Sequence, residues 1–307
     1  MNSNILKEYC EKNLNLDLVR ICEVDYYEDL KKYLTKRYDE NHITGMEEMD
    51  IEKRVNPKLI MENAKSIIVI AFPYYIGEFE NSNLSKYCLG EDYHLVTKKL
   101  MQNICDYLSE NIELNCDGEK FESKYFADTG VLNERYLATI SGIGYVGINN
   151  NIITDKYGSY VFLGYIVNNF EFEKDEPLNK TCCKCLKCVQ SCPPNALLGN
   201  FEMNPKKCLS YLTQTKDELS EKEKSLIKEN KNVFGCDICQ DVCPHNRNIE
   251  KSNISNFYDN IIEVLDIDEI RNMTNKEFKK EFREKAFNWR GKKIILRNLE
   301  IINEERK

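Results

Sequence analysis

The sequence predicts an α/β or α+β fold: a mixed domain of helices and strands, followed by a small cysteine-rich module and a short helical tail. Two observations carry this prediction. Helix-like and strand-like segments alternate over the first 170 residues, and nine of the fourteen cysteines lie between Thr181 and Asn246. A chain of 307 residues can hold one large domain and a small one. We therefore predict domains over residues 1–175, 176–250 and 251–307.

The predicted elements follow from the spacing of apolar residues. Ser66–Phe72 is a continuous, β-branched apolar run that ends at Pro73, which is typical of a buried central strand. Helical spacing predicts helices separated by turns over residues 1–60, and further helices over 92–109, 133–141, 216–230 and 249–307. Strands are expected over residues 120–127, 151–154 and 160–168.

Composition indicates a folded, soluble protein with 42% hydrophobic and 31% charged residues. The N-terminus has no basic start followed by an apolar run, so we expect a cytoplasmic protein without a membrane segment. A net charge of −8 argues against a general polyanion binder. Thr274–Asn298 nevertheless carries nine basic residues against three glutamates. We interpret this stretch as a solvated helix face, while a local contact with a polyanion stays open.

The cysteine spacing predicts two iron–sulfur clusters. Cys182, Cys185, Cys188 and Cys192 follow the C-x2-C-x2-C-x3-C-P pattern, in which the fourth cysteine crosses to the other cluster. The second run, Cys236-x2-Cys239-x3-Cys243-Pro244, is one cysteine short, and Cys208 can supply the missing ligand. Eight ligands then serve two [4Fe–4S] clusters: Cys182, Cys185, Cys188 and Cys243 for one, and Cys192, Cys208, Cys236 and Cys239 for the other.

Zinc is the alternative metal, because paired C-x2-C motifs also build structural zinc sites. It would leave the repeated C-x3-C-P pattern without an explanation, so clusters are the favoured interpretation. The other cysteines are expected to be small buried hydrophobes rather than ligands. They are Cys10, Cys22, Cys88, Cys105, Cys116 and Cys183.

The glycine-rich segment Gly142-Ile-Gly144-Tyr-Val-Gly147 formally matches G-x-G-x-x-G. A dinucleotide fingerprint needs a strand before it and a helix after it, and here a helix precedes and a strand follows, so NAD binding is disfavoured. Six of the thirteen glycines nevertheless fall within 35 residues of one another, between positions 130 and 164. This density indicates a backbone that packs closely against a large flat ligand.

Two polar positions are considered for functional roles, Asp128 as a proton donor and His94 as a cobalamin ligand. Asp128, in Asp128-Thr129-Gly130, follows a predicted strand and is either a turn or helix cap or the proton donor of a reductive reaction. Asp92-Tyr93-His94 begins a D-x-H-x-x pattern, but Thr97 stands where the cobalamin-binding motif has glycine. We therefore expect His94 to be a helix-surface histidine.

Taken together, these motifs closely resemble the epoxyqueuosine reductase family over residues 1–300. The segments that carry the resemblance are Asp128–Arg135, Ser141–Gly147, Tyr157–Gly164, the Cys182 array, Cys208–Lys216, Phe234–Pro244 and Asn288–Lys293. The resemblance implies a nitroreductase-like cobalamin-binding domain followed by a ferredoxin-like two-cluster domain. It also implies reduction of the epoxide of epoxyqueuosine in tRNA, with Asp128 as the catalytic proton donor.

The resemblance further implies cobalamin contacts at Arg54, Asp128, Ile152, Leu163, Ser210 and Asp237. Ile152 and Leu163 could equally be core strand residues, and Ser85 matches by position alone. The implied partners are the tRNA anticodon loop and an external low-potential electron donor. We expect a monomer that does not associate with membranes.

Two features depart from the family pattern. Ile148 stands where relatives often have lysine, and the chain stops soon after Trp289-Arg-Gly-Lys-Lys293, where many relatives continue into a helical-repeat domain. Two other functions therefore stay open: a corrinoid iron–sulfur reductase of another substrate, resembling reductive dehalogenases, and an iron–sulfur electron-transfer protein. Bound cobalamin would exclude the electron-transfer protein.

Overall fold

A four-stranded antiparallel sheet organises the first half of the chain in the computed structural model, which describes residues 2–115 and 117–304. The strand order is β1-β2-β6-β3, and each neighbouring pair is antiparallel. The strands are β1 (Val19–Glu23), β2 (Ser66–Pro73), β3 (Ser123–Phe126) and β6 (Val161–Asn168). Because no βαβ crossover joins neighbouring strands of this sheet, the fold is α+β.

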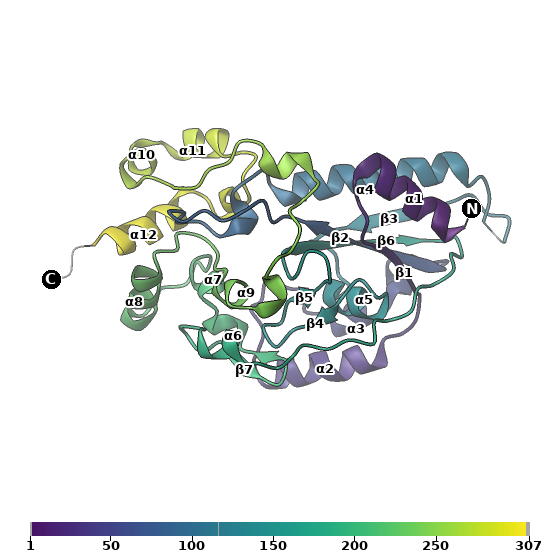
Figure 1. The fold of residues 1–307 in the computed structure, drawn as a ribbon, viewed down its shortest axis with the longest axis horizontal. Coiled ribbons are helices and arrows are strands. Elements are labelled where there is room, and N and C mark those ends of the chain that lie inside the picture. Colours follow the sequence, from purple (N-terminus) through teal and green to yellow (C-terminus); the bar gives the residue numbers. More distant parts are fainter. Residues whose placement is uncertain (1, 116, 305–307) are drawn as a thin grey trace.

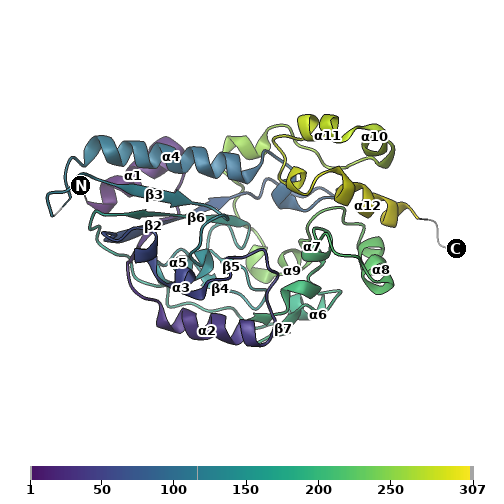
Figure 2. The ribbon, with the colours of Figure 1, turned by 180° about the vertical axis from the view of Figure 1, so that it is seen from behind.

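Helices cover both faces of this sheet (Figure 1, Figure 2). One face carries α1 (Ser3–Leu14) and α4 (Tyr93–Asn111), and the other carries α2 (Glu28–Asp39), α3 (Ile51–Val55) and α5 (Glu134–Ile140). All eight residues of β2 are buried, as expected for a central strand between two helical layers. Alternate β2 side chains enter different cores, with Ile70 beside Met101 on one side and Val69 beside Leu137 on the other.

The prediction of helices throughout residues 1–60 is wrong at β1. Val19–Glu23 is an edge strand, and its five residues pair with β2 from Val19↔Ile70 to Glu23↔Ser66. Val19 and Ile21 are buried in the same core as Ile70, while Arg20 between them is only partly buried. This period-two pattern spans too few residues to stand out among helices, so pairing with β2 decides the structure.

The glycine-rich segment connects α5 to a small hairpin made of β4 (Tyr145–Val146) and β5 (Ile152–Ile153). A helix therefore precedes the glycines and a strand follows them, which is the order that argued against a dinucleotide fingerprint. Tyr145, Ile148 and Ile153 of the hairpin pack against Cys182 and Cys188. The hairpin thus joins the sheet domain to the cysteine-rich region.

The cysteine-rich region consists of short elements. They are α6 (Lys187–Gln190), β7 (Leu197–Gly199), β8 (Glu202–Met203), α7 (Leu209–Leu212), α8 (Glu221–Asn230) and α9 (Ile238–Asp241). A capping box between Ser220 and Glu223 starts α8, because each residue's side chain accepts a hydrogen bond from the other's backbone N–H. Short 3-10 helices complete the chain: η1 (Pro57–Leu59), η2 (Lys86–Cys88), η3 (Pro205–Lys207), η4 (Pro244–Asn246), η5 (Ser255–Tyr258) and η6 (Ala286–Arg290).

The C-terminal segment packs onto the rest of the protein through α10 (Ile267–Asn272), α11 (Asn275–Glu281) and α12 (Lys292–Asn303). Phe278 and Phe287 share a core with Leu84 and Leu89 from the first half of the chain. On α12, the buried Asn298 amide donates hydrogen bonds to two main-chain carbonyls of the cysteine-rich region. The domain limits proposed from the sequence stay a prediction.

Among the described residues, no helix is both long and apolar enough to cross a membrane.

Candidate functional site

The eight cysteines predicted as ligands line two separate cavities, in the two groups of four that their spacing suggested. Cys182, Cys185, Cys188 and Cys243 line a small cavity beside the β4–β5 hairpin. Cys192, Cys208, Cys236 and Cys239 line a larger cavity of about 320 Å³. Burial raises the pKa of Cys236 to about 12, so this thiol needs a positively charged centre to become a thiolate. The donor set therefore fits iron–sulfur clusters, and the individual ligand assignments stay predictions.

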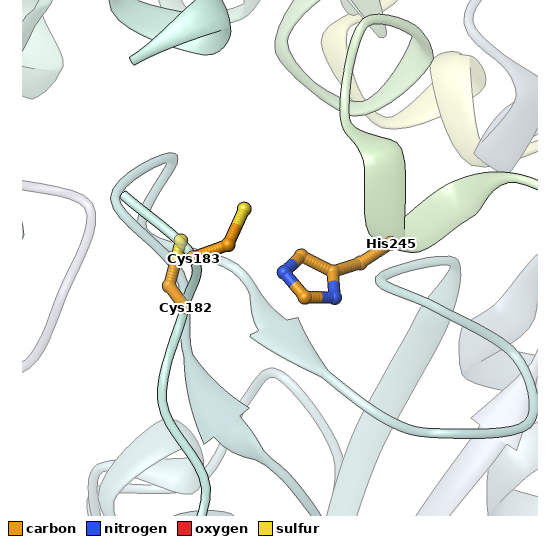
Figure 3. Close-up of side chains that lie close together, drawn as sticks. All are labelled: Cys182, Cys183 and His245. Atoms are coloured by element: carbon orange, nitrogen blue, oxygen red, sulfur yellow. The ribbon is translucent and has the colours of Figure 1, made fainter. Parts of the chain in front are cut away.

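The remaining cysteines differ in how far their side chains are exposed to solvent. Four of them, Cys10, Cys22, Cys88 and Cys105, are buried as expected, and Cys116 lies outside the described residues. The prediction for Cys183 is wrong, because this side chain is exposed. The ligand atoms of Cys182, Cys183 and His245 lie within 4.8 Å of one another (Figure 3).

Asp128 lies in the loop that follows β3, and its backbone has the uncommon positive φ of 60°. Its N–H donates a hydrogen bond of 2.7 Å to Glu134 Oε1, which fixes the loop against the start of α5. The carboxylate faces outward: the side chain is 60% exposed, yet Oδ2 accepts a hydrogen bond of 2.6 Å from Tyr93 Oη. Asp128 is therefore held by its backbone while its carboxylate stays accessible to a substrate.

His94 is the second partner of Asp128, which corrects the prediction of a simple helix-surface histidine. His94 Nε2 lies 3.2 Å from Asp128 Oδ2, and Nδ1 lies 2.8 Å from Oδ1 of Asp92, the N-cap of α4. Burial alone would lower the pKa of His94, but the hydrogen bonds to Asp128 and Asp92 outweigh it and raise this pKa to about 9. The hydrogen bond from His94 in turn lowers the pKa of Asp128. At neutral pH the pair is an imidazolium beside a carboxylate.

A third cavity, of about 600 Å³, opens at this acid site. Its lining includes Asp128, Glu134 and Arg54, one of the residues predicted to contact cobalamin. Burial, and secondarily the charge of Asp128, raise the pKa of Glu134 to about 8. Arg135 lines this cavity and also the cavity of the second cysteine group, and its guanidinium donates a 2.7 Å hydrogen bond to the carbonyl of Asn150. The acid site and the cysteine-lined cavity therefore adjoin at Arg135.

Two other predicted cobalamin contacts, Ser210 and Asp237, line the cavity of the second cysteine group. Asp237 is buried, and its carboxylate accepts hydrogen bonds from Ser85 Oγ at 2.5 Å and from the Lys86 N–H at 2.6 Å. Burial raises its pKa. Ser85, which matched the family by position alone, is therefore the hydrogen-bond partner of a cavity residue.

Ile152 and Leu163, the remaining predicted contacts, line neither of these two cavities. Ile152 is buried in the core between the sheet and α5, and Leu163 packs against the same core. Both positions have the surroundings of ordinary core strand residues. Their proposed contact with cobalamin stays a prediction.

The cluster of glycines serves packing inside the protein, which corrects the prediction of a surface for a flat ligand. A Cβ atom on Gly144 would lie 2.5 Å from the carbonyl oxygen of Ile153. At Gly142, with φ of +78°, a Cβ would lie 2.3 Å from the carbonyl oxygen of Glu176. In both places it is the protein's own backbone that requires glycine.

Sequence reasoning did not identify His94, Tyr93 or Arg135 as site residues. His94 and Asp128 are 34 positions apart, so only the packing of α4 beside the sheet brings them together. Arg135 follows the D-T-G segment by a few residues, and it could have been singled out as a charged residue in a helix with a buried face. Asn149 and Asn150, which also line the cavity of Cys208 and Cys236, follow Gly147 by two and three positions.

Comparisons with known proteins point to a single family. Residues 54–129 match the family model described as "Epoxyqueuosine reductase QueG, DUF1730", and residues 181–246 match the "4Fe-4S double cluster binding domain". The epoxyqueuosine reductase of Bacillus anthracis is 36% identical over 299 residues, which cover 94% of this chain and 76% of that protein.

Solved structures agree. The epoxyqueuosine reductase from Streptococcus thermophilus matches with a TM-score of 0.86 and 33% identity, over 98% of this chain and 81% of that one. An epoxyqueuosine reductase crystallised with an epoxyqueuosine-modified tRNA-Tyr stem loop matches with a TM-score of 0.88 and 33% identity, over 97% and 80% of the two chains.

Proposed function

Because the chain belongs to the epoxyqueuosine reductase family, we propose that it reduces the epoxide of epoxyqueuosine in tRNA to give queuosine. Iron–sulfur clusters in the double-cluster domain supply the electrons. The observation that carries this proposal is the junction at Arg135, where an accessible carboxylate site adjoins a cavity lined by four cysteines. The two alternative functions are not favoured, since the matching relatives are epoxyqueuosine reductases.

Cobalamin is the proposed link between the clusters and the epoxide. The cavity beside Cys208 and Cys236 has apolar and aromatic walls, including Phe162, and the polar side chains of Ser210 and Asp237. Such a lining suits a large, flat cofactor with polar substituents. When bound there, cobalamin supplies a strongly reducing and nucleophilic cobalt centre. Ser210 and Asp237 would hold it on the side of the cysteines, and Arg54 on the side of the acid site.

The proton chemistry is assigned to the Asp128–His94 pair. Removing the epoxide oxygen as water consumes two electrons and two protons, so the departing oxygen needs a proton source. Asp128 with a lowered pKa is ionised at neutral pH, whereas His94, with a pKa of about 9, holds a proton 3.2 Å away. Asp128 is the catalytic residue that contacts the substrate oxygen. His94 holds the first of the two protons, which reaches that oxygen through Asp128, and solvent then reprotonates the pair for the second.

A surface next to the acid site suits the tRNA. Trp289 is 56% exposed, and the guanidinium of Arg290 lies 3.5 Å from the centre of its ring. Arg290 Nη2 also lies 3.1 Å from the sulfur of Met46, which lines the cavity of Asp128. Exposed aromatic and guanidinium planes stack on unpaired bases. We therefore place the anticodon loop against Trp289, within the basic stretch 274–298.

The expectations of a cytoplasmic location, a monomer and an external low-potential electron donor complete the proposal. A tRNA substrate and one-electron carriers are both available in the cytoplasm. The molar mass of the purified protein, measured by light scattering, tests whether it is a monomer.

The decisive experiment supplies the anaerobically reconstituted protein with cobalamin, a reductant and epoxyqueuosine-containing tRNA, and then analyses digested tRNA for queuosine. Asp128→Asn should lose most activity, while Asp155→Asn, which removes an exposed ion pair with Lys180, should not. Absence of queuosine with the unaltered protein would refute the proposed reaction. Full activity of Asp128→Asn would refute only the role of Asp128.

A further inference from the structure

His245 has a buried ring nitrogen whose hydrogen-bonding capacity the protein does not use. Nε2 is inaccessible to solvent and has no hydrogen-bond partner in the described part of the chain. The other nitrogen, Nδ1, lies 3.3 Å from the Tyr145 hydroxyl, and the two rings meet edge to face, 5.9 Å apart. A buried donor left unpaired costs about 1–3 kcal/mol, so such a group needs an explanation.

The unpaired nitrogen faces the first group of cysteines. His245 lines the same cavity as Cys182, Cys185, Cys188 and Cys243. In Figure 3 the ring nitrogen farther from the main chain, Nε2, is turned toward Cys182 and Cys183. A cluster in this cavity would present thiolate and sulfide sulfurs, which accept hydrogen bonds, to the nitrogen that lacks a partner.

The position of the ring is fixed by its neighbours. His245 lies in η4, directly after Cys243 and Pro244. The next residue, Asn246, accepts a hydrogen bond of 2.7 Å from the Ser159 N–H and donates one of 2.8 Å to the Gln240 carbonyl. The bond with Ser159 connects the turn to the sheet domain, and the bond with Gln240 connects it to α9. If Tyr145 donates to Nδ1, the neutral imidazole carries its proton on Nε2, on the side of the cavity.

We infer that His245 donates a hydrogen bond from Nε2 to a sulfur of the cluster held by Cys182, Cys185, Cys188 and Cys243, and thereby raises that cluster's reduction potential. The added electron increases negative charge on the sulfurs, so a donor stabilises the reduced form more than the oxidised form. One electron arrives from a low-potential one-electron donor and leaves to the second cluster, and no covalent bond or proton transfer is involved. The inference rests on the proposed two-cluster assignment.

The two cysteine-lined cavities differ in how exposed their cysteines are and in which sites they adjoin. Cys183 and Cys185, beside the first cavity, are exposed, whereas the second cavity adjoins the acid site. Among the described residues that line the second cavity there is no histidine. The hydrogen bond therefore favours electron acceptance at the cluster nearer the surface, where an external donor can approach.

The experiment compares the reconstituted full chain with His245→Phe, which keeps a ring but removes both nitrogens, and with His42→Phe as a matched control. His42 lies beside Glu40 and lines neither of the two cysteine-lined cavities. Redox titrations followed by electron paramagnetic resonance report each cluster separately. In His245→Phe the ratio of reduced to oxidised first cluster should fall about tenfold at a fixed potential, a shift of about 59 mV for one electron. The second cluster, and both clusters of His42→Phe, should not shift.

Two further measurements keep the inference testable if His245→Phe does not retain its cluster. His245→Gln keeps an N–H donor and should preserve most of the potential. In the unaltered protein with ¹⁵N-labelled histidine, a weak hyperfine coupling to the reduced cluster is expected. An unshifted potential, or a strong coupling that indicates direct ligation of iron, would overturn the inference. An iron content below about eight per chain in the unaltered protein would instead contradict the two-cluster assignment.

Discussion

The ion pair between His94 and Asp128 predicts a histidine that stays protonated well above neutral pH. The pKa of His94 is about 9, well above its ordinary value of about 6.5. Hydrogen bonds to two carboxylates, Asp128 and Asp92, raise it. Asp128→Asn should therefore lower this pKa by about one unit or more. One unit corresponds to about 1.4 kcal/mol. Because the His94 side chain is 34% exposed, solvent screening should reduce the pair's contribution to stability to about 1 kcal/mol or less.

Nuclear magnetic resonance of the imidazole Cε1–H groups measures this pKa directly. The chain has three histidines, so His94→Gln identifies the signal by its loss. The raised pKa of His94 means that its stabilisation is complete below about 6.5 and is lost as the pH rises through about 9. The lowered pKa of Asp128 means that its stabilisation is present above about 3.8 and is lost as the pH falls below that value. The unfolding free energy should show the same dependence.

Activity should follow the protonation of His94 and decline on the alkaline side with a midpoint near pH 9. Glu134, with a pKa raised to about 8, also faces this site, so Glu134→Gln is measured in parallel. A His94 resonance that titrates near 6.5 in both the unaltered protein and Asp128→Asn would refute the reasoning. If activity still declines at high pH in His94→Gln, the decline is caused by the titration of another group.

Four further changes test other parts of the structure. Cys208→Ser should remove one cluster and about half of the iron, while Cys183→Ser should keep all of it, as measured by iron analysis. Asn298→Leu leaves two buried carbonyls without their donor and should lower the unfolding free energy by about 2–4 kcal/mol in urea titrations. Gly144→Ala forces a Cβ against a carbonyl of the adjoining strand and should cost about 1–3 kcal/mol, more than Gly45→Ala, where open space leaves only the strain of a positive φ. Trp289→Ala should raise the KM for tRNA more than it lowers kcat, and Trp289→Phe should restore most of the affinity; equal effects of both changes would contradict stacking.

The features that the sequence predicted well are those with a short, regular signal. The apolar run of β2 is continuous, so its burial on both faces could be read directly. Cysteine spacing is set by the geometry of a cluster, and the structure lines two cavities with the two predicted groups of four. The family assignment is confirmed by relatives that cover most of the chain.

The features that the sequence did not reveal depend on contacts between distant segments. β1 is a strand because β2 is available to pair with it, and His94 belongs to the acid site because α4 packs beside the loop of Asp128. The density of glycines suggested a ligand surface, whereas the close contacts at Gly144 come from the protein's own backbone. A glycine in the sequence indicates that a neighbouring group lies too close for a side chain, but it does not show whether that group belongs to a ligand or to the protein.

The packing of α12 has a consequence for the order in which the protein matures. Ile301 shares a core with Leu209 and Leu212, beside Cys208, and Cys236 packs against the same core. Synthesis proceeds from the N-terminus, so these cysteines leave the ribosome long before the helix that completes their surroundings. The core that supports Cys208 and Cys236 is complete only after α12 has been made. Iron delivered before that stage would meet cysteines that are still free to move.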